Sequence, residues 1–295
     1  MGFYKKELAI VDLDVRYLYD SNPCRQISQR ADWGREETVI YATLIILGLM
    51  VGSFLNVCIF RLPRELSIVT PRSFCPRCRS PIRWYDNIPL FSYIILLGKC
   101  RNCKRGIPIR YPAVEIISAL FSWYVFYHFR AWPPYVIYYL LLISPLIVIT
   151  FIDIEHKIIP DVITIPCIAA GVASRFILMH GKWTSVGGDT LAGILVGGGS
   201  LAIIAFVYEW FKKREGLGGG DIKLAAMLGA FFGWKGVIFI LFISSFIGSL
   251  VGVIFLILFK KDFKYAMPYG PFLAAGALIH LFWGDVILNW YLSLI

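Results

Sequence analysis

The sequence predicts an all-α polytopic membrane protein with about eight transmembrane helices and a small cytoplasmic zinc-binding domain between the first two. Three observations lead there. Hydrophobic residues make up 58% of the chain and charged residues only 16%, whereas a soluble domain is roughly a quarter charged. Apolar runs of about 18 residues or more recur, and each can cross a hydrocarbon core about 30 Å thick. Basic residues gather in only some of the segments between these runs.

The apolar runs divide the chain in order. Residues 1–37 form a polar tail with six basic and seven acidic side chains and no pattern of a cleavable signal peptide. The first span follows at 38–60, then the cytoplasmic segment 61–110, then a transmembrane domain over 111–295. The further spans are expected at 112–129, 134–152, 161–180, 187–211, 221–234, 236–259 and 270–294.

Loop charges orient the spans. The segment from Arg61 to Arg110 carries eleven Lys or Arg against two acids, Glu65 and Asp86, which places it in the cytoplasm. Counting onward, the loops at 153–160, 212–220 and 260–269 are also cytoplasmic, and both termini lie outside. The net charge of +10 is therefore explained by contact with membrane lipid headgroups, and no nucleic acid partner is expected.

Four of the seven cysteines form a pattern. Cys75 and Cys78 make one Cys-x-x-Cys turn, and Cys100 and Cys103 make a second. Two such turns supply four thiolates for a tetrahedral zinc ion, which would be structural because no coordination position stays open. Two disulfides or a redox pair are the alternatives, but a reducing cytoplasm disfavours structural disulfides.

Three aspartates lie at the ends of predicted spans: Asp153, Asp161 and Asp221. A charged side chain at such a position costs free energy when the span inserts into the membrane, so its presence needs an explanation. The simplest explanation is that Asp161 and Asp221 are helix N-caps. The alternative explanation is that Asp153 and Asp221, at the same side of the membrane, meet where their helices pack. Such a pair would share a proton and could activate water to attack an amide.

Several motifs in order resemble the type IV prepilin peptidases, intramembrane aspartyl proteases of the bacterial inner membrane. The resemblance spans residues 48 to about 275 and leaves the N-terminal tail outside. It rests on the cysteine segment and on five further motifs: Gly52-Ser-Phe-Leu-Asn-Val-Cys-Ile-Phe-Arg-Leu-Pro63, Asp86-Asn-Ile-Pro-Leu90, Arg110-Tyr-Pro-Ala-Val-Glu115, Asp153 to Ile159-Pro160-Asp161, and Gly218-Gly-Gly-Asp221-Ile-Lys-Leu.

The resemblance implies that Asp153 and Asp221 are the catalytic pair, with Asp161, Gly218 and Gly220 in support. It implies cleavage of the basic leader of prepilins or pseudopilins after a glycine, at the cytoplasmic edge of the membrane. It also implies N-methylation of the new N-terminus with S-adenosylmethionine, because the cysteine segment that the family associates with methylation is present.

The methyl-donor site is not located by any motif. Its polar candidates are Asn56, Arg61, Asn87 and Glu115, for which a role in holding the cytoplasmic segment to the spans is an equal alternative. Lys223 is expected to point away from Asp221, because residues two apart do not share a helix face. Two other function classes stay open: a proton-coupled or cation transporter using the same carboxylates, and a membrane scaffold that docks partners through its zinc segment.

Overall fold

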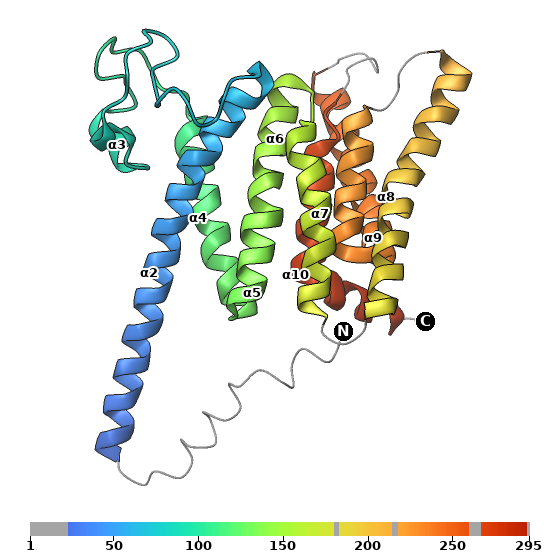
Figure 1. Cartoon of the computed structure of the whole chain (residues 1–295), viewed down its shortest axis with the longest axis horizontal. Helices are drawn as coiled ribbons and strands as arrows, with labels where there is room; N and C mark the ends of the chain where they lie inside the picture. The colour runs from blue at the N-terminus through green and yellow to red at the C-terminus, as the bar shows by residue number, and fades with distance from the viewer. Residues whose placement is uncertain (1–22, 180–182, 214–217, 260–266, 294–295) are drawn as a thin grey trace.

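The structure, a computed structural model, describes residues 23–179, 183–213, 218–259 and 267–293. Over these residues the chain is helical and contains no strands, apart from two isolated β-bridges in the cysteine segment (Figure 1). The helices are α2 (Pro23–Arg61), η1 (Leu62–Arg64), η2 (Trp84–Asn87), α3 (Phe91–Ile95), α4 (Arg110–Phe129), α5 (Trp132–Tyr135), η3 (Val136–Ile143), α6 (Ser144–His156), α7 (Asp161–Leu178), α8 (Trp183–Lys212), α9 (Gly219–Phe259) and α10 (Gly270–Leu292).

Six stretches among the described residues are long and apolar enough to cross a membrane, which makes the chain a multi-pass membrane protein. They lie in α2, in the continuous run from α5 through α6, and in α7, α8, α9 and α10. The predicted span 112–129 is the helix α4, which packs along α2 but falls outside these six. The predicted spans 221–234 and 236–259 both lie in α9. The first helix begins earlier than the predicted span, at Pro23.

Helix α9 is folded back on itself at Gly233. The backbone there has φ 72° and ψ −177°, a conformation that only glycine adopts readily. As a result Gly197 of α8 faces both limbs: a Cβ placed on it would lie 2.4 Å from the Ala225 carbonyl oxygen and 2.9 Å from Val237 Cγ2. Residues 225 and 237 would be about 18 Å apart along one straight helix. The two limbs therefore correspond to the two spans that the sequence predicts here.

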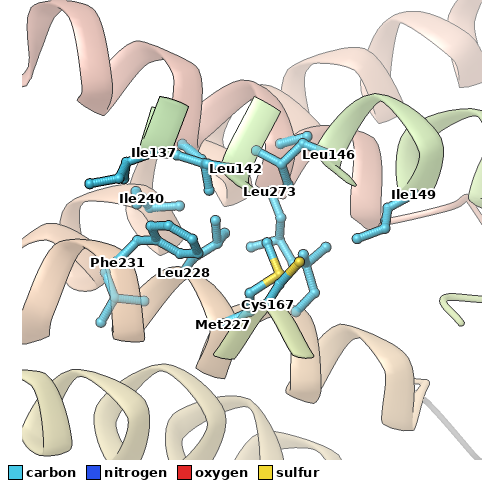
Figure 2. Close-up of a cluster of buried hydrophobic side chains, with 14 residues drawn as sticks. Ile137, Leu142, Leu146, Ile149, Cys167, Met227, Leu228, Phe231, Ile240 and Leu273 are labelled. Atoms are coloured by element: carbon cyan, nitrogen blue, oxygen red, sulfur yellow. The ribbon is translucent and has the colours of Figure 1, made fainter. Parts of the chain in front are cut away.

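Two apolar clusters hold the helices together. The first joins η3, α6, α7, both limbs of α9 and α10, through side chains such as Leu142, Cys167, Met227 and Leu273 (Figure 2). The second joins α2, α4, η3 and α6, and includes Cys58. Cys58 and Cys167 thus act as small apolar side chains, as their positions inside spans predict. Packing fixes the ends of α6, α9 and α10 relative to one another, which positions the site.

The cysteine segment and the turn between α6 and α7 lie at the same end of the helices (Figure 1). Helix α2 ends there at Arg61, α4 begins there at Arg110, and the ion pair of Arg110 with Glu155 joins α4 to the last turn of α6. The segment between the first two long helices is therefore attached to the helix that carries Asp153.

Candidate functional site

Asp153 lies in the last turn of α6 and is only 5% exposed. The helix ends because Lys157 adopts the left-handed conformation (φ 56°), and its N–H caps the Asp153 carbonyl oxygen. The carboxylate itself is held by a residue far along the chain. The N–H of Gly270, at the start of α10, donates to Asp153 Oδ2 at 2.9 Å. Burial and this hydrogen bond fix the side chain toward the start of α10.

Asp221 lies in the first turn of α9, directly after three glycines. The helix begins at Gly219, so the alternative in which Asp221 serves as its N-cap is wrong. Gly220 packs so closely on the turn after α6 that a Cβ there would lie 2.8 Å from Ile159 Cβ. A Cβ on Gly218 would lie 3.4 Å from Asp221 Oδ2. The glycines therefore allow the start of α9 to approach the helix that carries Asp153.

The structure thus brings Asp153 and Asp221 together from helices far apart in sequence. Ile159 contacts the positions of both Gly220 and Gly270, so one short turn links the two carboxylate sites. The two carboxylates lie close enough for their charges to interact. Two carboxyl groups that approach each other in this way can serve as the acid and the base of one reaction.

Asp161 has a different environment from the pair. Its side chain is 51% exposed, and its Oδ2 accepts a 2.6 Å hydrogen bond from Lys223 Nζ of α9. The N-cap of α7 is Pro160 and makes no side-chain cap, so the alternative of Asp161 as N-cap is also wrong. The pair joins the first turns of α7 and α9. Lys223 therefore has a partner that the sequence did not reveal.

Two residues of this site escaped the sequence analysis: Tyr269 and Gly270. Tyr269 shares a hydrogen bond of 3.1 Å with Ser245 of the second α9 limb. Burial, the largest cause, together with the charge of Asp221 raises the pKa of Tyr269. The run Pro268-Tyr-Gly-Pro271 before an apolar helix is a turn signal that could have marked the place.

The second candidate site is the cysteine cluster. The sulfurs of Cys75, Cys78, Cys100 and Cys103 all lie within 4.8 Å of one another. Cys75 and Cys103 have their sulfurs 4.0 Å apart, whereas a disulfide bond is about 2.05 Å long. All four are free thiols. Tetrahedral zinc–sulfur bonds of about 2.3 Å place sulfurs roughly 3.8 Å apart, so the donor set fits a metal ion rather than two disulfides.

The two Cys-x-x-Cys turns have the same backbone design. In each, the residue after the second cysteine is left-handed, at Arg79 (φ 57°) and Lys104 (φ 58°). Its N–H donates to the carbonyl oxygen of the first cysteine, at 2.9 Å for Arg79 and 3.0 Å for Lys104. The local turns therefore present each cysteine pair to the other without a sheet or a core to support them.

The four polar candidates for the methyl-donor site line a single cavity of about 810 Å³ between the cysteine segment and helices α2 and α4. Two of them also hold the segment in place. Arg61 donates to the carbonyl oxygens of Ser67 and Pro71, each at 2.7 Å, and Glu115 accepts from the Leu90 N–H. Arg61 and Glu115 thus make the contacts that the structural alternative expects. Asn56 donates to the Tyr111 carbonyl oxygen at 2.9 Å, which joins α2 to α4 instead.

Two family models match the chain in succession. The Bacterial Peptidase A24 N-terminal domain matches residues 46–129, which include the cysteine segment. The Type IV leader peptidase family matches residues 140–253, which include all three aspartates. The two matches together cover the cysteine cluster and both carboxylates, and neither reaches the N-terminal tail.

Curated relatives give the same result over most of the chain. A prepilin leader peptidase/N-methyltransferase of Pseudomonas aeruginosa is 39% identical over 84% of this chain and 92% of its own length. The protein of that name from Aeromonas salmonicida is 35% identical over 87% of this chain and 95% of its own length. One from Myxococcus xanthus is 41% identical over 72% of this chain and 62% of its own length. No solved structure gives a significant match. The chain belongs to the type IV leader peptidase family.

Proposed function

We propose that this protein is a prepilin peptidase and N-methyltransferase that cleaves prepilins or pseudopilins with Asp153 and Asp221. The observation that carries the proposal is the convergence of these two carboxylates from α6 and α9, one of them fixed by the Gly270 N–H. Relatives that bear both activities in their name align over more than four fifths of the chain. Asp161 supports the site through Lys223, and Gly218 and Gly220 do so by leaving space beside Asp221.

The chemistry follows from two carboxyl groups in different protonation states. The ionised carboxyl takes a proton from a water molecule while the water oxygen attacks the peptide carbonyl carbon. The protonated carboxyl hydrogen-bonds to the carbonyl oxygen and stabilises the developing charge. When the carbon–nitrogen bond breaks, the leaving amine receives a proton from the pair, and the products are a new carboxyl terminus on the leader and a new amino terminus on the pilin. The dyad then returns to one shared proton.

The cysteine segment 61–110 is proposed to be a domain that holds one structural Zn²⁺ through Cys75, Cys78, Cys100 and Cys103. The closed four-thiolate set leaves the ion no position for catalysis. Residues 111–295 form the peptidase domain. S-adenosylmethionine is the proposed methyl donor, and when bound it supplies an electrophilic methyl group for the new N-terminal amine.

The site is proposed to lie at the cytoplasmic face of the bacterial inner membrane. Of the described residues, the basic cysteine segment and the turn that leads out of α6 share one end of the helices (Figure 1). Basic residues near spans favour the cytoplasmic side. A basic leader retained in the cytoplasm would then meet the carboxylates where its apolar helix enters the lipid.

One assay tests the peptidase. The purified protein is mixed with a prepilin in detergent, and cleavage is followed for the wild type, Asp153→Asn and Asp221→Asn. Each variant should lose at least about 10²-fold in cleavage rate, because acid–base groups of this kind contribute roughly 10²- to 10⁴-fold.

The matched control is Asp285→Asn, which changes an exposed carboxylate near the other end of α10 and should cleave as the wild type does. Full cleavage by either active-site variant would refute the assignment. Labelled S-adenosylmethionine in the same reaction reports methylation separately.

The transporter alternative receives no support. A proton or cation path requires carboxylates near the middle of the membrane. Asp153 lies in the last turn of α6, and Asp161 and Asp221 lie in the first turns of their helices, so all three are at helix ends. The relatives are named as peptidases and methyltransferases.

A further inference from the structure

The cavity between the cysteine segment and helices α2 and α4 has the size of a small-molecule site. Its volume of about 810 Å³ falls within the roughly 300–1,000 Å³ of ligand pockets. Its walls come from α2, η2, α3, α4 and the two Cys-x-x-Cys turns, and one wall includes Glu155 of α6. Three polar groups on these walls carry the inference: Asn56, Arg110 and Glu115.

Asn56 presents an unpaired acceptor. The residue is 2% exposed, and its Nδ2 donates to the Tyr111 and Gly52 carbonyl oxygens at 2.9 and 3.3 Å. Those two bonds fix which way the amide faces, and its Oδ1 is buried with no partner. A buried acceptor without a donor costs about 1–3 kcal/mol. The position therefore calls for a ligand that brings an N–H group.

Glu115 presents a buried carboxylate. It is 8% exposed and accepts a 2.8 Å hydrogen bond from the Leu90 N–H, which is aimed at it because Leu90 is held at φ 57°. No ion pair among the described residues includes Glu115. Burial raises the pKa of Glu115, while hydrogen bonds from the Leu90 N–H and the Ser53 side chain lower it, so a positive partner would stabilise the ionised carboxylate further. The second acceptor in the cavity therefore calls for a cation.

Arg110 presents an unpaired hydrogen-bond donor, whereas Asn56 and Glu115 present acceptors. One of its terminal nitrogens pairs with Glu155, while its Nε is buried and makes no hydrogen bond. That donor calls for an acceptor such as a carboxylate. The three groups together require a ligand that carries a cation, an N–H donor and an anion. A phosphate or anionic headgroup would satisfy Arg110 and leave both acceptors unpaired.

We propose that this cavity is the S-adenosylmethionine site, an inference that rests on the methyltransferase activity proposed above. The ligand has a positively charged sulfonium and ammonium for Glu115, N–H groups for Asn56, and a carboxylate for Arg110. Tyr93, Tyr111 and Phe74 offer aromatic surface for the purine ring. Glu155, on the cavity wall, belongs with Asp153 to the last turn of α6, so the cavity and the candidate carboxylate pair lie at the same end of one helix.

The test is a binding measurement on the purified full chain in detergent, with S-adenosylmethionine titrated by calorimetry and no prepilin present. Glu115→Gln keeps an oxygen for the Leu90 N–H and removes the charge. Arg110→Lys keeps a cation for Glu155 and removes the Nε donor. Each should weaken binding about tenfold or more, as loss of a hydrogen bond to a charged group does. The control, Glu65→Gln, changes an exposed carboxylate and should bind as the wild type does.

Prepilin cleavage by the same samples reports folding and separates this inference from the peptidase proposal. Weakened binding with cleavage retained in either variant supports the site. If the wild type cleaves and methylates prepilin, and both variants bind S-adenosylmethionine with wild-type affinity, the proposed site is overturned. A wild type that neither cleaves nor methylates would instead refute the proposed function itself.

Discussion

Surroundings, rather than residue type, distinguish the three aspartates. Asp153 is almost fully buried and accepts the Gly270 N–H, whereas Asp161 is half exposed and paired with Lys223. Asp221 has glycines on its N-terminal side and Asp153 within electrostatic reach. The Lys223 contact ties the Asp161 carboxylate to the first turn of α9. Asp161 is therefore suited to positioning α9, and the other two are suited to sharing a proton.

Gly270→Ala is predicted to slow cleavage without unfolding the protein. The new Cβ would lie 2.6 Å from Asp153 Oδ2 and would push the carboxylate out of place. A displacement of about 1 Å at reacting groups can cost roughly 10²-fold in rate. The rate constant for prepilin cleavage, measured at saturating substrate, should fall by about tenfold or more.

The control for this substitution is Gly199→Ala on α8, where a Cβ would meet nothing within 4 Å. That variant should cleave normally. An unchanged rate constant in Gly270→Ala would show that the N–H contact does not position Asp153.

At the scale of elements, two backbone features shape the molecule: the reversal of α9 and the paired cysteine turns. The reversal lets α9 supply both Asp221 at its start and Ser245, the partner of Tyr269, on its second limb. The cysteine turns hold a segment that has few regular elements of its own.

An ion pair also supports the cysteine segment. The Arg101 guanidinium, in the turn from Cys100 to Cys103, makes a bidentate contact with Asp86, keeps the pKa of Asp86 below its usual range and ties η2 to that turn.

Gly233→Ala is predicted to destabilise the fold at the reversal. A residue with a Cβ at φ 72° and ψ −177° costs about 1–3 kcal/mol in backbone strain. Its Cβ would also collide with Arg175 and Asp189, a partly buried ion pair between α7 and α8. The midpoint of thermal denaturation in detergent should drop clearly, while Gly252→Ala, which enters open space, should leave it unchanged. Equal midpoints would contradict the strained conformation.

The double variant Cys75→Ser/Cys78→Ser is predicted to lose one zinc ion per chain. Two thiolates cannot hold a structural zinc that requires four ligands, and metal binding supplies much of the stability of so small a segment. Metal analysis of the purified protein measures the loss. Cys167→Ala, which removes a buried thiol far from the cluster, should retain the ion; unchanged zinc in the double variant would dismiss the assignment.

For the whole molecule, the functional groups gather at one end. The cysteine segment, the cavity, the turn between α6 and α7 and the starts of α9 and α10 meet there, linked by Arg110 with Glu155 and by Gly270 with Asp153. Large apolar side chains remain exposed along the helices, as expected where they face lipid. The proposed cleavage and methylation sites therefore lie at the same end of the helices, as one substrate that undergoes both reactions would require.

A reporter enzyme that is active only in the cytoplasm, fused after Arg83, is predicted to be active. The same reporter fused after Arg130, in the turn between α4 and α5 at the opposite end, should be inactive. The reason is the excess of basic residues in the cysteine segment. The reverse result would invert the proposed orientation and place the carboxylates outside.

The sequence alone determined the parts that depend on local order. Runs of apolar residues define the spans, because crossing a membrane depends on length and hydrophobicity within one stretch. The four cysteines were identified because each half of the cluster is a four-residue turn. The placement of Asp153 and Asp221 at span ends on one side followed from counting spans, and this gave the candidate pair.

Only the tertiary structure decided what those residues touch. The Gly270 N–H reaches Asp153 across 117 positions, and Lys223 reaches Asp161 across 62. Asn56, Arg110 and Glu115 enclose one cavity only because α2 and α4 pack together under the cysteine segment. Such contacts depend on how several helices pack together, so they cannot be predicted from any single stretch of sequence.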